Sequence, residues 1–224
     1  NLFLSILCVL LAGSALHAAK KPNIICILVD DLGYSDLSSF GGKDIKTPAI
    51  DKLMGAGMRF DQFYANCTVC TPTRYSIMTG QMVFRLNYPG VFTGVGGPGL
   101  IKEDRLTLPG MLRDQGYETA RFGKWHIGMS FLDRNGAVIN VKEPPRETSR
   151  ELKQKIGLDA VKRIDYSRAI PDAPIHRGFD HFFGTVCCPT SDWLYAFIDG
   201  DRIPTPPTQI LDRDKLPKHE WSFD

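Results

Sequence analysis

Two patterns of hydrophobic and polar positions take turns along the chain: short apolar runs, which predict strands, and helical apolar spacing, which predicts helices. Residues 23–29 (NIICILV) form a continuous apolar run rich in β-branched side chains, which is typical of a strand buried on both faces of a sheet. Residues 59–65 and 117–122 predict further strands, whereas helical apolar spacing with glycine stops predicts helices from residue 47 and over residues 106–115. Strands that alternate with helices indicate an α/β fold, with a mostly parallel central sheet and helices on both faces.

Residues 70–80 (CTPTRYSIMTG) predict another helix, and this one begins with a reactive side chain. Thr71 is suited to cap the helix, and Gly80 fits just beyond its end. Cys70 then lies at the positive end of the helix dipole, with the guanidinium of Arg74 one turn away. We expect this helix terminus to hold a negatively charged oxygen or sulfur.

The first segment of the chain differs from the rest. Residues 2–16 are nearly all apolar, end among small residues and are followed by Lys20 and Lys21, as in a secretory signal peptide. We assign residues 1–19 to this peptide and expect its first residues to be missing, because the chain starts with Asn and lacks a basic beginning. A buried N-terminal helix is the alternative. The sequence thus predicts an exported protein (periplasmic, extracellular or lysosomal) with no stable membrane span after signal cleavage.

The charge balance narrows the possible functions. The chain carries 27 basic and 25 acidic residues, mixed along its length, and 43% of its residues are hydrophobic. This composition excludes a disordered chain and a nucleic-acid-binding surface. We expect residues 20–224 to form one portion of a globular domain, with a charged surface insertion around residues 134–172.

The six cysteines do not form a recognisable framework. Their spacings match neither a dense set of disulfides nor a paired zinc-binding motif. Cys67 and Cys70 form a single CxxC, which would suit a redox pair but lacks a thioredoxin-like context. The sequence assigns no role to the adjacent Cys187 and Cys188.

Two acidic residues follow the first predicted strand. Asp30 and Asp31 would lie beyond its carboxyl end, which is where ligands bind in open α/β sheets. Two adjacent carboxylates are suited to bind a hard cation through oxygen. Solvated loop acids or helix caps are the alternative.

Two basic residues follow a later strand. Lys124 and His126 come directly after the strand at 117–122 and Gly123, and in extended backbone they would share one face. Lysine offers a point charge for an anion, and histidine can exchange a proton near neutral pH. Singly, they would be a surface lysine and a histidine with satisfied hydrogen bonds. Together with the acids and the cysteine helix, they indicate a metal-assisted site for a tetrahedral oxyanion.

Four stretches resemble signatures of one enzyme family. C-T-P-T-R through T-G at residues 70–80 is similar to the C-x-P-x-R signature of type I, formylglycine-dependent sulfatases of the alkaline phosphatase superfamily. Residues 116–126 (GYETARFGKWH) resemble the second signature of that family, and residues 22–33 its first strand and metal loop. Residues 176–184 (HRGFDHFFG) are also similar to a stretch common there, so the resemblance runs from about residue 21 to 184.

The resemblance implies a role for each matching residue. Cys70 would be converted by a separate maturation enzyme to formylglycine, whose hydrated aldehyde attacks the sulfur of a sulfate ester. Asp30 and Asp31, together with the formylglycine at position 70, would bind Ca²⁺ rather than Mg²⁺. Arg74 would hold the hydrate, Lys124 the sulfate oxygens and His126 the formylglycine hydroxyl.

The resemblance also implies a sulfated small molecule or carbohydrate as the substrate. Trp193, with Asp192 and Tyr195, is a candidate for lining the substrate pocket, and core packing is the alternative for the aromatic residues. Sulfatases of this type are usually about twice as long, so we expect further metal ligands beyond Asp224. By itself, the 224-residue chain is then expected neither to bind calcium tightly nor to turn over substrate.

Three other functions remain open from the sequence. The first is a phosphonate or phosphate ester hydrolase of the same superfamily. The second is a non-catalytic secreted binding protein in which Cys70 remains a thiol. The third is a hydrolase that uses the Cys70 thiolate directly as its nucleophile.

Overall fold

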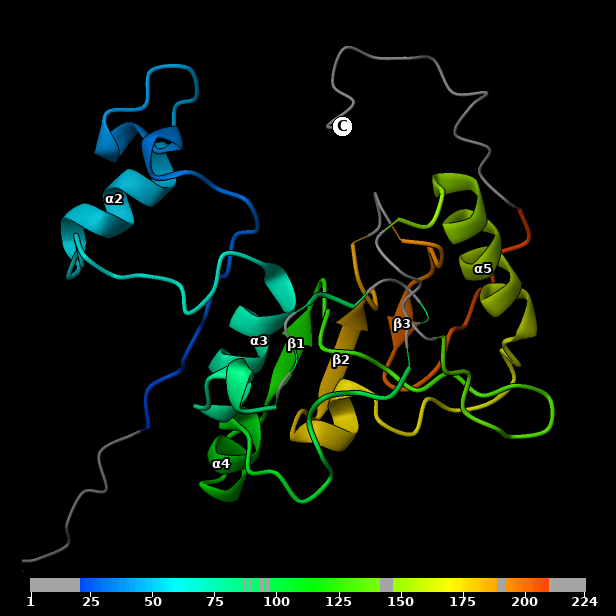
Figure 1. Ribbon diagram of the computed structural model, residues 1–224. Helices are drawn as coiled ribbons and strands as arrows, with labels where there is room; N and C mark the ends of the chain where they lie inside the picture. Colours follow the sequence, from blue (N-terminus) through cyan, green and yellow to red (C-terminus); the bar gives the residue numbers. More distant parts are fainter. Residues whose placement is uncertain are drawn as a thin grey trace, which may run out of the picture. The chain divides into compact units, whose positions relative to one another are not determined.

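The sequence folds into two compact units, residues 1–59 and 60–224 (Figure 1). The structure is a computed structural model and describes residues 21–86, 88, 90–92, 95, 97–141, 147–188 and 192–209. The expected signal peptide at residues 1–19 and part of the expected insertion lie outside the described residues. Along the part of the chain that is described, no helix has both the length and the apolar character needed to cross a bilayer.

The first unit is built around one helix. Its elements are η1 (Tyr34–Asp36), η2 (Ser38–Phe40) and α2 (Pro48–Ala56). The Asp51 carboxylate ties α2 to η2, because it accepts hydrogen bonds from the Ser38 hydroxyl at 2.6 Å and the Ser39 amide at 3.1 Å. These bonds, led by that of Ser38, lower the pKa of Asp51. The predicted helix from residue 47 is confirmed.

The first predicted strands do not appear in the structure. Residues 23–29 have no regular secondary structure and are exposed, with Ile25 and Ile27 among the most accessible apolar side chains. Residues 59–65 are also irregular and exposed. A strand is defined by its hydrogen-bonded neighbour, and among the described residues the three strands of the sheet all come from the second unit. The apolar patterns therefore identified segments with the composition of strands, but they could not identify a neighbouring strand for them.

The second unit contains a small mixed sheet. Its elements are α3 (Cys70–Thr79), η3 (Val83–Leu86), α4 (Leu108–Asp114), β1 (Ala120–Phe122), α5 (Arg150–Arg163), η4 (Pro174–Arg177), β2 (His181–Gly184) and β3 (Ile198–Asp199). β1 and β2 are parallel, with Ala120 paired to His181, and β3 is antiparallel to β2. Figure 1 shows α3 and α4 toward the β1 edge of this sheet and α5 toward the β3 edge.

The pairing of β1 and β2 continues beyond the two strands. The amides of Gly123, Trp125 and His126 donate to the carbonyls of Phe183, Thr185 and Val186 at 2.9, 2.9 and 2.7 Å. Gly184 allows this close approach, since a Cβ there would overlap the Gly123 backbone. The segments that follow the two strands therefore run side by side past their carboxyl ends.

A buried core holds this edge of the sheet. Trp125 and Ile127, on either side of His126, are almost completely buried, and the Trp125 indole meets the Phe182 ring edge-on. Further members of the same core are Tyr75, Val95, Ile101, Met129, Phe131, Ile139, Val186, Leu194 and Ile198. Because its neighbours are anchored in this core, the backbone at His126 is fixed in position.

Helices α3 and α4 of the second unit lie where the sequence predicted them, but some of their ends differ from the prediction. α3 begins at Cys70, and its N-cap is Val69 rather than the predicted Thr71. Gly80 follows the helix in the left-handed region at φ 66°, as predicted. α4 is shorter than the predicted 106–115 because the Thr107 side chain caps it by accepting from the Gly110 amide.

Candidate active site

Cys70 is the first residue of α3, and a lysine contacts its sulfur. The Lys124 ammonium donates to the Cys70 Sγ over 3.2 Å, so residues 54 positions apart in sequence meet at the helix start. The Cys70 side chain is partly buried, and no side-chain hydrogen bond from the N-cap residue occupies the first turn of α3. Helix dipole and ammonium both favour negative charge at this point.

Arg74 lies one turn into the same helix and is buried. Its guanidinium donates to the Lys124 carbonyl at 2.8 Å, and Arg121 donates to the same oxygen at 2.6 Å. Two guanidinium groups therefore hold the backbone from which the Lys124 side chain extends. Through this bond, Arg74 acts on the loop that carries Lys124.

Thr71 has a role that sequence analysis missed. Its hydroxyl is fully buried, donates to the His126 carbonyl at 2.8 Å and accepts from the Phe92 amide at 3.2 Å. The expected N-cap role was wrong because the hydroxyl turns inward from a helical position. The burial of Thr71 beside Cys70 would have indicated this role, but the sequence motif does not show which side chains are buried.

His126 has unusual backbone geometry, and both nitrogens of its ring have neighbours. Its φ of 59° is left-handed, which is uncommon for a residue other than glycine. It is buried, its Nε2 lies 2.7 Å from the Phe92 carbonyl, and its Nδ1 lies 3.8 Å from the Cys188 sulfur. A carbonyl oxygen can only accept, so Nε2 carries the hydrogen and the neutral ring has its lone pair on Nδ1.

The expectation that Lys124 and His126 share a face of an extended segment was wrong. The backbone turns at Gly123, with φ 90°, and again at His126. Both side chains nevertheless lie close to the Cys70 sulfur. The sulfurs of Cys70 and Cys188 and a ring nitrogen of His126 all lie within 4.8 Å of one another.

The two acidic residues lie in the first unit. Asp30 and Asp31 are exposed, and Asp31 has a left-handed φ of 54°, which turns the chain directly after residues 23–29. Two carboxylates fit the oxygen preference of calcium but supply only part of the six to eight oxygens that it takes. The donor set therefore fits a calcium site that needs further ligands.

One of the three candidate substrate residues contacts the cysteine pair. The Asp192 amide donates to the Cys188 carbonyl at 3.0 Å. The Trp193 indole packs against Gly157 of α5, where a Cβ would overlap the ring, and Tyr195 is exposed. Trp193 therefore makes the packing contact that sequence analysis held open as the alternative to a pocket role.

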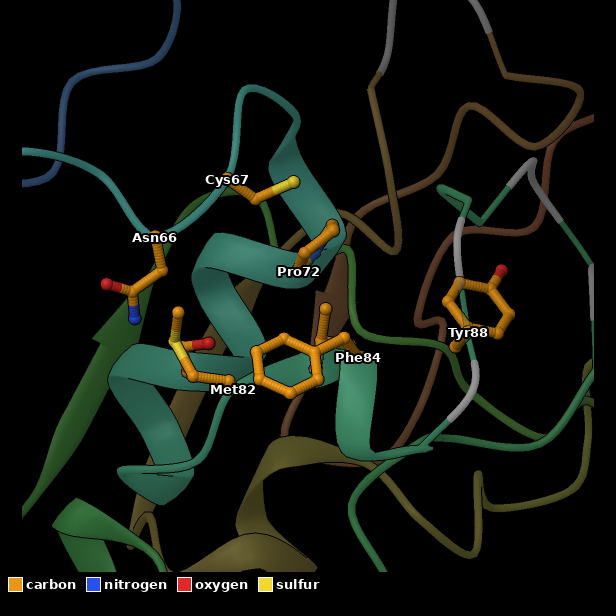
Figure 2. A pocket seen from close by; sticks show the side chains of 8 residues that line it. Asn66, Cys67, Pro72, Met82, Phe84 and Tyr88 are labelled. Atoms are coloured by element: carbon orange, nitrogen blue, oxygen red, sulfur yellow. The ribbon is translucent and has the colours of Figure 1, made fainter.

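A separate pocket of ≈ 220 Å³ lies against α3. Figure 2 shows Cys67, Pro72, Met82 and Phe84 around it, and Ser76 also lines it. Positions 72 and 76 lie on the helix face opposite to positions 70 and 74, because residues four apart share a face. This mostly apolar pocket is therefore not lined by Cys70 or Arg74.

A comparison with protein-family models assigns the chain to a family. The sulfatase family model matches residues 22–193, well over half of the sequence. This chain belongs to the sulfatase family. The match includes Cys70, Lys124 and His126, so the cluster described above lies inside the sulfatase domain.

Similar proteins include sulfatases from human and bacterial sources. The sulfatase domain is 43% identical over 119 residues to human steryl-sulfatase, a match that covers 51% of this chain and 20% of that protein. It is 40% identical over 141 residues to an N-acetylgalactosamine-6-O-sulfatase of Bacteroides thetaiotaomicron, covering 63% of this chain and 26% of the relative. The chain thus spans about a fifth to a quarter of these curated relatives.

Solved structures show the same fold. One from a study of glycosaminoglycan metabolism by Bacteroides thetaiotaomicron has a TM-score of 0.64 and 28% identity, and covers 83% of this chain and 32% of its own. Ps i-CgsB, at 23% identity and a TM-score of 0.59, covers 85% of this chain and 38% of its own, and shows the fold alone. The predicted α/β sulfatase fold is confirmed.

Proposed function

We propose that the protein hydrolyses sulfate esters through a formylglycine made from Cys70. The observation that carries the proposal is the convergence of a lysine ammonium and a histidine ring on the Cys70 sulfur at a helix N-terminus. In this structure the sulfur stands in for the oxygens of the hydrated aldehyde. Conversion breaks the Cβ–S bond, releases the sulfur as sulfide and oxidises Cβ by two electrons to an aldehyde. It requires a separate maturation enzyme with an external oxidant.

The modified residue supplies two hydroxyls on one carbon, one to attack the ester sulfur and one to expel sulfate as the aldehyde re-forms. Lys124 binds sulfate oxygens, because its ammonium already donates to the atom at the reacting position. The α3 N-terminus adds a positive dipole on the same side. Fixed positive charge around developing negative charge usually contributes more to such catalysis than any other effect.

His126 exchanges the proton of a formylglycine hydroxyl. Its Nε2 hydrogen is used by the Phe92 carbonyl, so Nδ1 is the atom that can accept a proton. Nδ1 is also the ring nitrogen on the side of the cysteine cluster. Arg74 is proposed to hold the formylglycine hydrate, and its bond to the Lys124 carbonyl helps to fix the loop that carries the ammonium.

Calcium is the proposed cofactor, with Asp30 and Asp31 as two of its ligands. A divalent ion there would act as a Lewis acid toward a sulfate oxygen. The remaining ligands are proposed to come from outside the residues described. Export to the periplasm, the extracellular space or the lysosome is proposed from the apolar leader sequence.

The proposed substrate is a sulfated carbohydrate or small molecule. One relative is named for a 6-O-sulfated N-acetylgalactosamine and another for a steryl sulfate, so both a sugar and a steroid sulfate belong in the test set. The substrate pocket of the whole protein decides between them. Trp193, whose ring packs against Gly157 of α5, is proposed to line one wall of that pocket together with Asp192.

The test is a combined modification and activity assay on the whole protein. Mass spectrometry of the peptide that contains Cys70 should show formylglycine, and aryl, steryl and sugar sulfates should be hydrolysed at rates that fall when Cys70 is replaced by Ala. Cys67→Ser is the matched control, because it changes the other cysteine of the CxxC and should leave activity intact.

Three results would contradict the proposal. Faster cleavage of phosphonate or phosphate esters than of sulfates would favour the other hydrolase of this superfamily. An unmodified Cys70 without hydrolysis would favour a binding protein. An unmodified Cys70 with hydrolysis would favour a direct thiolate nucleophile.

A further inference from the structure

Cys188 is not used by the proposed reaction, yet its sulfur lies within the cluster at Cys70. The Cys70 and Cys188 sulfurs and a His126 ring nitrogen lie within 4.8 Å of one another, and the Cys188 Sγ is 3.8 Å from Nδ1. The three residues come from the start of α3 and from the segments that follow β1 and β2. The extended β1–β2 pairing fixes two of these segments against each other.

The His126 ring is oriented as metal-binding histidines are. Such a ring donates its second N–H to a backbone carbonyl or a carboxylate, which fixes the tautomer and directs the lone pair at the metal. Here Nε2 lies 2.7 Å from the Phe92 carbonyl, and Nδ1 lies 3.8 Å from the Cys188 sulfur. The ring is buried, so this orientation is held by the core.

The donor set selects a soft metal rather than calcium. Two thiolates and one imidazole are ligands typical of Zn²⁺, whereas calcium takes oxygen. Tetrahedral zinc, with Zn–S of about 2.3 Å and Zn–N of about 2.0 Å, separates its ligand atoms by roughly 3.5–3.8 Å. The observed separations of up to 4.8 Å require a closure of about 1.3 Å at most, and Cys70 and Cys188 are each only partly buried, which leaves a fourth position for water.

Lys124 is compatible with such an ion. Its ammonium donates to the Cys70 sulfur at 3.2 Å, and a metal-bound thiolate still accepts hydrogen bonds. Two thiolates balance the charge of Zn²⁺, and Lys124 interacts with the sulfur rather than the metal.

We propose that the protein with unconverted Cys70 binds one Zn²⁺ ion through Cys70, His126 and Cys188. Formylglycine formation removes one of the two sulfurs, so this site exists only before conversion and excludes the proposed active form. The inference needs only the thiol, and does not rest on sulfatase activity.

The experiment uses the whole protein produced with Cys70 shown by mass spectrometry to be unconverted. Co²⁺ is titrated as a spectroscopic probe and displaced by Zn²⁺. We expect one ion per chain with sulfur-to-cobalt charge-transfer absorption. Cys188→Ser and His126→Gln should each weaken binding by at least about 10–100-fold, the loss typical of removing even an outer partner. Cys67→Ser is the matched control and should bind as the parent protein does.

A second measurement does not depend on variants that fold. Zn²⁺ should slow alkylation of Cys70 and Cys188, resolved by peptide mass spectrometry, but not that of the exposed Cys26. Binding that survives Cys188→Ser, or equal alkylation of Cys70 with and without Zn²⁺, would each overturn the inference. Neither of these outcomes bears on whether the converted protein hydrolyses sulfate esters.

Discussion

The Lys124 ammonium lies 3.2 Å from the Cys70 sulfur. The backbone of Lys124 is held separately, through its carbonyl oxygen. Its carbonyl, not its side chain, accepts the hydrogen bonds from Arg74 and Arg121. The charge at the helix start can therefore be removed without removing the contacts that fix the loop. This separation makes Lys124 the clearest test of the site.

Replacing Lys124 by Ala should reduce kcat/KM for a sulfate ester by about 10²–10³-fold, the loss typical of one preorganised group that stabilises transition-state charge. The thermal midpoint should stay close to that of the parent, because the carbonyl contacts remain. Steady-state kinetics and thermal unfolding check the two expectations. Lys155→Ala, on the exposed side of α5, is the matched charge control, and equal activity in both variants would remove Lys124 from the site.

Thr71 joins three parts of the site through one hydroxyl. Thr71→Val keeps the shape but leaves the buried His126 carbonyl and Phe92 amide without this partner, so the free energy of unfolding should fall by about 1–3 kcal/mol. Thr71→Ser keeps the hydroxyl and should lose about 1 kcal/mol or less, for the missing methyl group. Denaturant unfolding compares them. Equal losses would show that packing, rather than the hydroxyl, holds this junction.

Two substitutions distinguish the roles of the two ring nitrogens of His126. A Gln at this position can still donate to the Phe92 carbonyl but has no group equivalent to the basic Nδ1, whereas Ala loses both. Both variants should lose about 10²–10⁴-fold in kcat, as expected for a general acid–base group. Only His126→Ala should also lose about 1–3 kcal/mol of stability, because it leaves the buried carbonyl without its donor. Activity retained in His126→Gln would contradict the assignment of Nδ1.

The sequence predicted the helices of the site better than its strands. Proline and glycine mark the beginning and end of α3 directly, because they constrain the backbone of the residues that carry them. Strands depend on partners distant in sequence. Residues 23–29 have a strand composition, but this composition cannot supply a neighbour, and in the structure these residues are exposed.

The grouping of the candidate residues was predictable where they lie in motifs, whereas contacts that depend on burial were missed. Cys70, Lys124 and His126 follow signatures in the chain, and they do meet. Thr71 was misassigned because its inward direction results from packing against residues more than 50 positions away. Cys188 carries no motif, and only the pairing beyond β1 and β2 brings it to His126.

The Asp180 carboxylate should make the stability of the second unit depend on pH. It accepts from the Thr119 amide at 2.8 Å and from the Thr119 hydroxyl at 3.0 Å, which joins the segment before β2 to the start of β1. The amide bond is the largest cause that lowers the pKa of Asp180, followed by the hydroxyl bond, while Arg113 and His181 add smaller electrostatic contributions. The folded state therefore favours the ionised form.

A lowered pKa in the folded state fixes the sign of the pH effect. The stabilisation is complete above the unfolded pKa of about 3.9 and is lost as pH falls through the lower folded pKa. Asp180→Asn should therefore be less stable than the parent at neutral pH, and the gap should close on acidification. Urea unfolding from neutral pH to below pH 4 measures the gap, and Asp104→Asn, on an exposed turn, controls for the loss of one negative charge. A gap that stays constant through the acid range would show that Thr119 binds Asp180 equally well in both protonation states.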